Sequence, residues 1–171
     1  LLPRLFAKET KERHVDMVEE GKKAPDFTLP ANGGEKIKLS QFQGRPVVVY
    51  FYPKDDTSGC TKEAIAFTEL MPEFDKIGAA IIGISPDSAE SHDKFIAKHD
   101  LGVMLAADEE KKVAEKYGVW VEKSMYGRKF MGVERSTFLI DPKGKVARVW
   151  RKVKVNGHAD AVLEAARELA G

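Results

Sequence analysis

The sequence predicts an α/β domain in which helices flank a mixed central β-sheet. Three observations lead to this class: two continuously apolar stretches typical of buried strands, segments of helical periodicity around them, and a strand pair followed by a helix near the C-terminus. Strand–helix–strand alternation gives parallel strands, whereas a hairpin adds an antiparallel pair. Together these patterns predict a mixed sheet.

The first predicted element is an N-terminal β-hairpin within residues 22–39, with its turn at Asn32-Gly33-Gly34. The charged segment 1–20 is predicted to be an N-terminal extension, from upstream of the native start or from cloning, with Met17 as a possible native first residue. We therefore expect one domain over residues 21–171.

The central elements alternate between strands and helices. The stretch Val47–Tyr52 is apolar and rich in β-branched and aromatic side chains, which favours a strand covered on both faces. A helix is expected from Cys60 to Ile77, where Pro72 should kink or break it. The other predicted central elements are a strand at Ala79–Ile84, a helix from about Ser88 to His99, a strand at Val103–Ala106 and a helix at Glu109–Lys116.

A hairpin and a helix complete the predicted fold. Ser136–Ile140 and Val146–Trp150 flank Asp141-Pro142-Lys143-Gly144, whose residue types and spacing are those of a turn. The last helix is expected to begin after Asn156-Gly157 and to run through Leu169.

Composition and charge exclude several classes of protein. Hydrophobic residues make up 43% of the 171 residues, enough to bury a core, and the net charge of +1 predicts no nucleic-acid-binding face. No apolar run approaches the roughly 20 residues of a membrane span. The single cysteine excludes an internal disulfide and a cysteine-rich metal site, and it fits a reducing, cytoplasmic compartment.

The four histidines are scattered, and we expect no metal or cofactor. His92 and His99 lie seven residues apart and would share a helix face, but no carboxylate pair completes a ligand set. Such histidines are usually solvated surface residues, and we expect that here.

The segment most informative about chemistry runs from Tyr50 to Glu63. A buried strand ends at Pro53, a polar loop follows, and Cys60 opens a helix. The first turn of a helix stabilises a thiolate through its free N–H groups and its positive dipole end. Thr57, three residues earlier, is close enough for its hydroxyl to face the same pocket. A free cysteine is also commonly a small buried residue, so position alone leaves both interpretations open.

Several stretches of the chain resemble the peroxiredoxins. The spacing of Pro53, Thr57 and Cys60 matches their active-site signature P-x-x-x-T-x-x-C, and FYPKDDTSGCTKEA is similar to the bacterioferritin-comigratory, or Q-type, subfamily. GKKAPDFTLP, IIGISPD and YGVWVEKSMYGRKFMGVERSTFLID extend the resemblance over roughly residues 21–170. The resemblance implies a thioredoxin-like fold and an antioxidant enzyme that reduces hydrogen peroxide and organic hydroperoxides to water or alcohols with thiols.

The resemblance also implies roles for individual residues. The Cys60 thiolate would attack the peroxide and become a sulfenic acid, Thr57 would hydrogen-bond the peroxide, and Pro53 would shield the thiolate from water. Arg135, within GVERSTF, matches an arginine that reaches the cysteine pocket and binds the peroxide oxygens. Glu63 would orient Arg135 or the loop. A solvated charge at Arg135 and a carboxylate favoured only by the helix dipole at Glu63 remain open.

Two positions depart from the subfamily pattern. Ser58 stands where proline is usual, which leaves the loop freer. Ile65 stands where a resolving cysteine is often found, five residues after Cys60. This one-cysteine variant, natural or engineered, would therefore need an external thiol such as thioredoxin, glutaredoxin or a small thiol. We expect a monomer or weak homodimer.

Three other functions compete for the same residues or the same fold. A dithiol oxidoreductase is disfavoured because Glu63, rather than a second cysteine, lies three residues after Cys60. A redox sensor or holdase that signals through sulfenylated Cys60 would use the same side chains, so the sequence does not separate it from a peroxidase. A ligand-binding module lacks any phosphate-loop or dinucleotide-binding motif.

Overall fold

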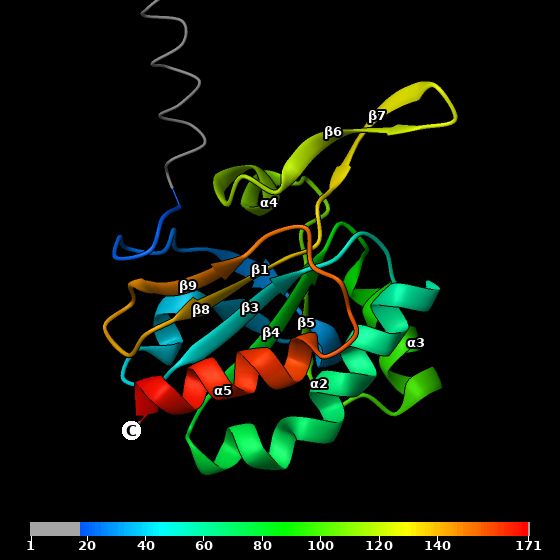
Figure 1. The fold of residues 1–171 in the computed structure, drawn as a ribbon. Helices are drawn as coiled ribbons and strands as arrows, with labels where there is room; N and C mark the ends of the chain where they lie inside the picture. The colour runs from blue at the N-terminus through cyan, green and yellow to red at the C-terminus, as the bar shows by residue number, and fades with distance from the viewer. Residues whose placement is uncertain (1–17, 171) are drawn as a thin grey trace, which may run out of the picture.

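The computed structural model describes residues 18–170 and confirms the predicted α/β class. A central five-stranded sheet has the order β5-β4-β3-β8-β9 (Figure 1). The strands are β3 (Val47–Phe51), β4 (Ala80–Ser85), β5 (Met104–Ala107), β8 (Ser136–Ile140) and β9 (Val146–Trp150). β3, β4 and β5 are parallel, whereas β8 pairs antiparallel with both β3 and β9, so the sheet is mixed as expected.

β3 lies at the centre of the sheet because both of its faces are apolar. Its side chains alternate between two clusters of buried residues: Val47, Val49 and Phe51 belong to one, and Val48 and Tyr50 belong to the other. A strand covered on both faces needs a continuous apolar run, which is what the sequence shows there.

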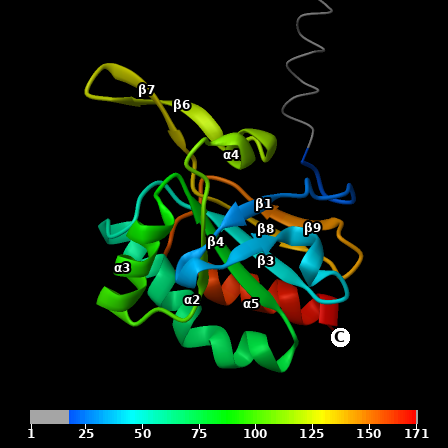
Figure 2. The ribbon, with the colours of Figure 1, turned by 180° about the vertical axis from the view of Figure 1, so that it is seen from behind.

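Helices cover one face of this sheet (Figures 1 and 2). α2 (Ser58–Lys76), α3 (Ala89–His99) and α5 (His158–Ala170) contribute side chains to the cluster that contains Tyr50. α2 runs unbroken through Pro72, and Figure 1 shows its axis turning toward the C-terminal end, so the proline bends the helix and does not end it.

The other face is covered by shorter elements. The N-terminal hairpin is confirmed: β1 (Thr28–Pro30) pairs antiparallel with β2 (Lys36–Lys38) around a turn of 3₁₀ helix, η1 (Asn32–Gly34). A second 3₁₀ turn, η2 (Leu39–Phe42), follows. α4 (Lys112–Lys116) is shorter than expected.

The short α4 has a local cause. The carboxylate of Asp108 accepts hydrogen bonds from the backbone N–H groups of Val113 and Ala114. These bonds satisfy free amides at the start of the helix, so residues 109–111 form the turn before it and are not part of it.

One hairpin has no counterpart among the predicted elements. β6 (Trp120–Met125) and β7 (Arg128–Val133) form a separate two-stranded sheet that projects from the body in Figures 1 and 2. Its strands are largely exposed, so they lack the apolar alternation by which strands are recognised.

The predicted N-terminal extension, residues 1–20, lies mostly outside the described residues. Val18, however, is buried in the core, and the Gly21 N–H donates to the carbonyl of Val146. Within residues 18–170 no helix is long and apolar enough to cross a membrane.

Candidate active site

Cys60 lies in the first turn of α2, as the sequence predicted. The helix begins at Ser58, directly after the loop that leaves the end of β3. The sulfur-bearing residue is 1% exposed and packs beside Ala64 and Phe67 in the cluster of Tyr50. The thiol is therefore enclosed, at the carboxyl end of a central strand.

Arg135 brings a guanidinium to this thiol from 75 residues away in the chain. Its Nη2 donates to Cys60 Sγ at 3.2 Å. Sheet register explains the approach: Ser136 pairs with Phe51, the last residue of β3, so the residue before Ser136 lies beside the loop that leads to Cys60. The Arg135 carbonyl accepts a bond from the Val153 N–H, which fixes the backbone there.

Glu63 lies on the other side of the same guanidinium. Arg135 Nη1 donates to Glu63 Oε1 at 2.6 Å, and the carboxylate is 1% exposed. Among the described residues its second oxygen, Oε2, has no hydrogen-bond partner. Burial therefore raises the pKa of Glu63 to about 7, although the positive charge of Arg135 opposes that shift.

The charges around Arg135 keep it protonated. Burial of its side chain acts to lower the pKa, but the negative charges of Glu63 and Cys60 outweigh it and raise the pKa above its ordinary value. The three side chains thus form a line, Glu63–Arg135–Cys60, in which one cation contacts both a carboxylate and a sulfur.

Gly59 makes room for this arrangement. A Cβ at that position would lie 3.2 Å from Arg135 Nη2, closer than most side-chain carbons approach a neighbour. The absence of a side chain at Gly59 therefore favours the close approach of the guanidinium to the start of the helix, because a Cβ there would displace the guanidinium.

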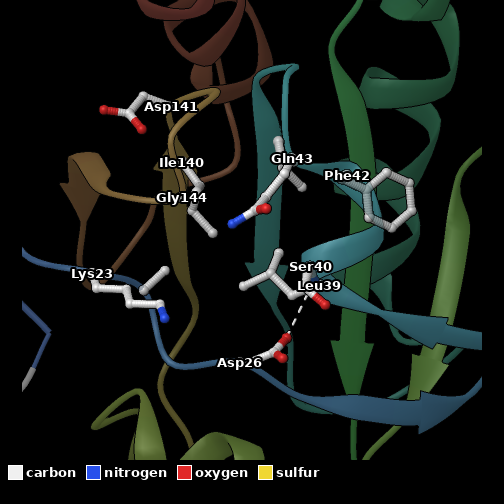
Figure 3. A pocket seen from close by; sticks show the side chains of 11 residues that line it. Lys23, Asp26, Leu39, Ser40, Phe42, Gln43, Ile140, Asp141 and Gly144 are labelled. Atoms are coloured by element: carbon white, nitrogen blue, oxygen red, sulfur yellow. Dashed lines mark hydrogen bonds between the residues drawn. The ribbon is translucent and has the colours of Figure 1, made fainter.

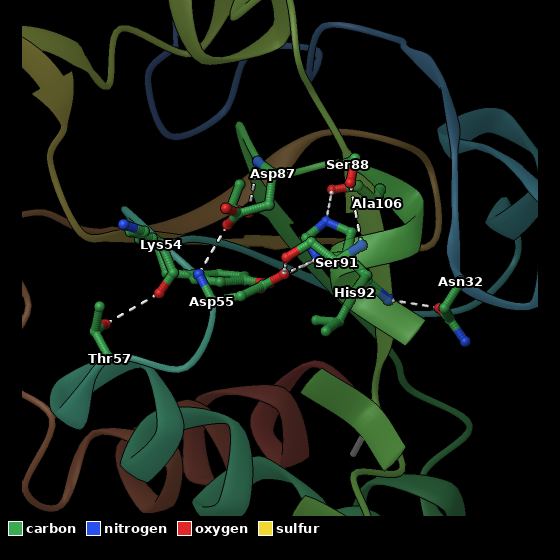
Figure 4. A network of polar contacts seen from close by, with 12 residues as sticks. Asn32, Lys54, Asp55, Thr57, Asp87, Ser88, Ser91, His92 and Ala106 are labelled. Carbon is green, nitrogen blue, oxygen red and sulfur yellow. Dashed lines mark hydrogen bonds and ion pairs between the residues drawn. The ribbon is translucent and has the colours of Figure 1, made fainter. Parts of the chain in front are cut away.

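A buried polar network fixes the loop before Cys60 (Figure 4). The Asp55 carboxylate accepts bonds from Tyr52 Oη at 2.6 Å and Ser91 Oγ at 2.8 Å, and it lies 2.8 Å from Nδ1 of His92. The Asp55 N–H donates to Asp87, just after β4. The loop is thus bonded to both α3 and the β4 end of the sheet.

Asp56 extends this contact to the far end of α3. Its carboxylate forms an ion pair with Lys98 Nζ at 2.6 Å and lies 2.8 Å from Nε2 of His99. The two aspartates of the loop therefore contact the two histidines that lie seven residues apart on α3.

The expectation of solvated histidines is wrong for two of the four. His92 is fully buried, with Nε2 2.9 Å from the carbonyl of Ala106, and His158 is 7% exposed. Burial, with a smaller contribution from Arg135, lowers the pKa of His158 to about 4, so it is neutral. His14 lies outside the described residues. The pairing of adjacent aspartates with histidines at helical spacing was the signal that could have identified the loop contacts.

The remaining predicted site residues lie in the segment between β3 and α2. Thr57 precedes α2, is exposed, and donates its hydroxyl proton to the carbonyl of Lys54 at 3.0 Å (Figure 4). Pro53 is half-buried between β3 and this loop, and Ser58 is exposed as the first helical residue. The Thr57 oxygen keeps its lone pairs available to accept a bond.

Two concave sites lie away from Cys60. The smaller, about 60 Å³, lies between the N-terminal segment, η2 and the β8–β9 turn, with Asp26 and Ser40 joined by a hydrogen bond inside it (Figure 3). A larger one, about 340 Å³, lies beside β1 and α4. Neither is lined by a residue of the Glu63–Arg135–Cys60 line. Among residues 18–170, no three histidine, cysteine or acidic side chains are placed to bind a metal ion.

Comparison with known proteins identifies the relatives of this chain. Residues 20–149 match the sequence profile of the AhpC/TSA family. Peroxiredoxin Bcp of Bacillus subtilis is 47% identical over 153 residues, which cover 90% of this chain and 98% of the relative.

Solved structures give the same relationship. Peroxiredoxin Q of Xanthomonas campestris superposes with a TM-score of 0.84 at 46% identity, covering 89% of this chain and 99% of the other. A bacterioferritin comigratory protein structure from the same organism, described for its alkyl peroxide reduction activity, has a TM-score of 0.84 at 45% identity and covers 90% of this chain and all of the other.

The profile match spans well over half of the chain, and the relatives agree along nearly their whole length. The thioredoxin-like fold implied by the sequence resemblance is therefore confirmed. The chain belongs to the AhpC/TSA family as a peroxiredoxin of the Bcp type with a single cysteine, and it is a thiol-dependent peroxidase.

Proposed function

We propose that Cys60 is the nucleophile of this peroxidase and that Arg135 binds the peroxide beside it. The observation that carries the proposal is the 3.2 Å contact between Arg135 Nη2 and Cys60 Sγ in an enclosed site. A guanidinium at hydrogen-bond distance stabilises a thiolate, and its planar fork presents further donors to a second ligand.

The reaction is a displacement at oxygen. The thiolate of Cys60 attacks the nearer oxygen of ROOH, an S–O bond forms and the O–O bond breaks. The departing oxygen leaves with the electron pair, takes a proton, and becomes water or an alcohol. Cys60 is oxidised to a sulfenic acid and the peroxide is reduced by two electrons.

Four further residues support this step. Arg135 stabilises the negative charge that develops along the breaking O–O bond. Glu63 positions Arg135 through the 2.6 Å ion pair and does not touch the peroxide itself. The Thr57 oxygen, whose proton is already donated to Lys54, accepts a bond from the peroxide hydroxyl, and Pro53 limits access of water to the thiolate.

An external thiol completes the cycle. The chain has one cysteine, and Ile65 stands five residues after Cys60, so no disulfide forms within the chain. A thiol from another molecule therefore reduces the sulfenic acid, which suits a reducing compartment such as the cytoplasm. We propose organic hydroperoxides as substrates beside hydrogen peroxide, since a relative is described for alkyl peroxide reduction.

The test is peroxide consumption by wild type and Cys60→Ser with dithiothreitol as the reductant. We expect the variant to be inactive while its circular dichroism and melting temperature stay close to wild type. If it keeps a tenth of the rate, a barrier change of about 1.4 kcal/mol, Cys60 is not the nucleophile. Repeated turnover by wild type also separates a peroxidase from a sensor, which would react once per molecule.

A further inference from the structure

The β6–β7 hairpin carries the large apolar side chains that the described part of the chain leaves most exposed. These are Met125 (58% exposed), Tyr126 (97%), Phe130 (43%) and Met131 (49%). No other large hydrophobic side chain in residues 18–170 is comparably exposed. A contiguous group of this kind on one projecting element is typical of an interaction surface.

Strand register assigns these side chains to faces. Lys123 pairs with Phe130 and Met125 with Arg128, and paired residues share a face. These four residues form one side of the hairpin, here called the Phe130 face. Contacts at Gly132 agree, because a Cβ there would meet both Lys123 Cδ at 3.2 Å and Phe130 Cε2 at 3.6 Å.

The opposite side differs in character. Glu122 pairs with Met131 and Ser124 with Lys129, and these four residues alternate with those of the Phe130 face. Both sides thus carry an exposed methionine. The Phe130 face also has an aromatic ring and only positive charges, whereas the opposite side has the loosely paired Lys129 and Glu122, 3.8 Å apart.

The β6–β7 hairpin is continuous with the strand end that carries Arg135. β7 leads through Val133 and Glu134 directly into Arg135, and the Glu134 N–H donates to the Val119 carbonyl at the base of the hairpin. Burial and the positive charge of Arg135 lower the pKa of Lys123, and the negative charges of Glu134 and Cys60 partly oppose them. Lys123 therefore lies within electrostatic range of both site residues, at the inner end of the Phe130 face.

The chemistry requires a thiol from outside the chain, and a docked partner supplies one efficiently. The sulfenic acid formed on Cys60 is reduced only by a thiol from another molecule, and Cys60 is 1% exposed. A thiol that meets an enclosed sulfur only in brief collisions reacts slowly, whereas a partner docked next to the site keeps its thiol available at a high effective concentration.

We propose that the Phe130 face is the docking surface for a protein dithiol reductant with an apolar and acidic surface around its thiol. This rests on the proposed function of Cys60. The composition fits, since aromatic residues, methionine and arginine are enriched in protein interfaces. Lys123 and Arg128 complement acidic groups on the partner. A projecting hairpin also offers a surface to a protein, whereas small molecules bind in concave sites.

The docked reaction balances without a further reactant. One thiolate of the reductant attacks the sulfenic sulfur of Cys60, an S–S bond forms, and hydroxide leaves as water after taking a proton. The second thiol of the reductant then attacks the reductant's first sulfur, which is bonded to Cys60 in the mixed disulfide, and Cys60 is released as a thiolate. The reductant leaves as a disulfide, and Cys60 is restored.

The experiment compares two apolar-to-polar variants on opposite sides of one hairpin. Phe130→Ser removes the ring of the Phe130 face, and Met131→Ser is the matched control because it is similarly exposed on the other side. Turnover is measured with thioredoxin recycled by its reductase, with glutaredoxin recycled by glutathione, and with dithiothreitol. The peroxide step is followed separately by stopped flow in a single turnover.

We expect Phe130→Ser to lower kcat/KM for the protein reductant at least tenfold while leaving dithiothreitol turnover and the peroxide step within twofold of wild type. Met131→Ser should stay within twofold in every assay. Equal losses in the two variants, or a Phe130→Ser loss that dithiothreitol shares, would overturn the assignment. So would wild-type turnover with dithiothreitol but with neither protein.

A second pair tests the charge and guards against misfolding. Arg128→Glu should weaken turnover with the protein reductant in a salt-dependent manner, and Lys129→Glu, its neighbour on the opposite side, should have less than a third of that effect. Equal effects would contradict docking on the Phe130 face. A loss limited to long-chain hydroperoxides would assign the face to substrate instead, and failure to form any sulfenic acid would reject the proposed function itself.

Discussion

Two segments border the Cys60–Arg135 pair, and each places a non-glycine residue at positive φ. In the loop before Cys60 this residue is Asp56, with φ of 58°, and its carboxylate contacts Lys98 and His99 of α3. In the β6–β7 hairpin it is Tyr126, with φ of 53°, at the tip of the turn and 97% exposed. The backbone conformation is the same, but the surroundings are opposite.

The loop before Cys60 is held in place by the rest of the fold, whereas the β6–β7 hairpin is free to contact a partner. The loop makes side-chain bonds to α3 and to the end of β4, so its conformation follows from contacts far apart in sequence. In the β6–β7 hairpin, the backbone conformation at Tyr126 is set only by the pairing of two exposed strands. Changes in the loop should therefore alter stability or chemistry, whereas changes at the hairpin should mainly alter binding.

Arg135→Lys should have the largest effect, because Arg135 lies at the junction of the two segments. Lysine keeps the charge but loses the fork that contacts Cys60 and Glu63 together. Loss of one well-placed donor in a water-excluded site costs roughly 3 kcal/mol, or about a hundredfold in rate. The measurement is the second-order rate constant for hydrogen peroxide, with folding checked separately. Equal constants would remove Arg135 from the mechanism.

Glu63 should give the protein a pH-dependent stability. Its pKa is about 7 in the folded state, against 4.5 for an ordinary glutamate. Between these two pH values the folded protein keeps a proton that the unfolded chain has released. The contribution of Glu63 is fully present below pH 4.5 and is lost as pH rises through 7, by up to roughly 3 kcal/mol. Urea unfolding of wild type and Glu63→Gln from pH 4.5 to 8.5 tests this.

In the Glu63→Gln variant the stability should fall less steeply across that range. Glu69→Gln is the matched control, because that side chain is exposed on the same helix. Parallel stability curves for wild type and Glu63→Gln would show that burial of this carboxyl does not raise its pKa.

His92→Leu should test the loop side of the comparison. Leucine fills similar space but leaves the Asp55 carboxylate without one of its buried partners, at a cost of roughly 2 kcal/mol in the free energy of unfolding. Met131→Ser on the hairpin should change stability by less than about 0.5 kcal/mol. Chemical denaturation of both variants at one pH measures the difference, and equal values would mean that the loop is no better fixed than the hairpin.

The tightly packed elements were predictable from sequence because burial imposes a pattern. β3 and β4 lie within one residue of their expected bounds, since a strand between two apolar layers must be apolar throughout. β8 and β9 have their expected bounds because the turn between them is recognisable from its residue types. Cys60 at the start of a helix also followed from a polar loop between a strand and a periodic segment. These inferences need only local sequence.

The contacts across the chain were beyond local sequence. That Arg135 reaches Cys60 depends on the antiparallel pairing of β8 with β3, which residue spacing does not specify and which only the family resemblance suggested. The burial of His92 depends on α3 lying against the Asp55 loop. The β6–β7 hairpin was not predicted, because neither of its faces is buried enough to impose an alternation of apolar and polar residues.

The smallest expected effect concerns the tip of the hairpin. Tyr126 and Gly127 both have positive φ, as the two central residues of a type I′ turn do, and asparagine is preferred over an aromatic residue at the first of them. If the tyrosine is present for a partner rather than for the turn, Tyr126→Asn should stabilise the protein, by about 0.5 kcal/mol, because asparagine tolerates the left-handed conformation better.

The matched change in the loop, Asp56→Asn, keeps that tolerance but loses the charge that faces Lys98 and His99, and it should destabilise the protein. Thermal unfolding of both variants distinguishes the two segments by sign. If Tyr126→Asn is less stable than wild type, the tyrosine ring contributes to folding. The hairpin tip would then be fixed by the fold, as the loop before Cys60 is.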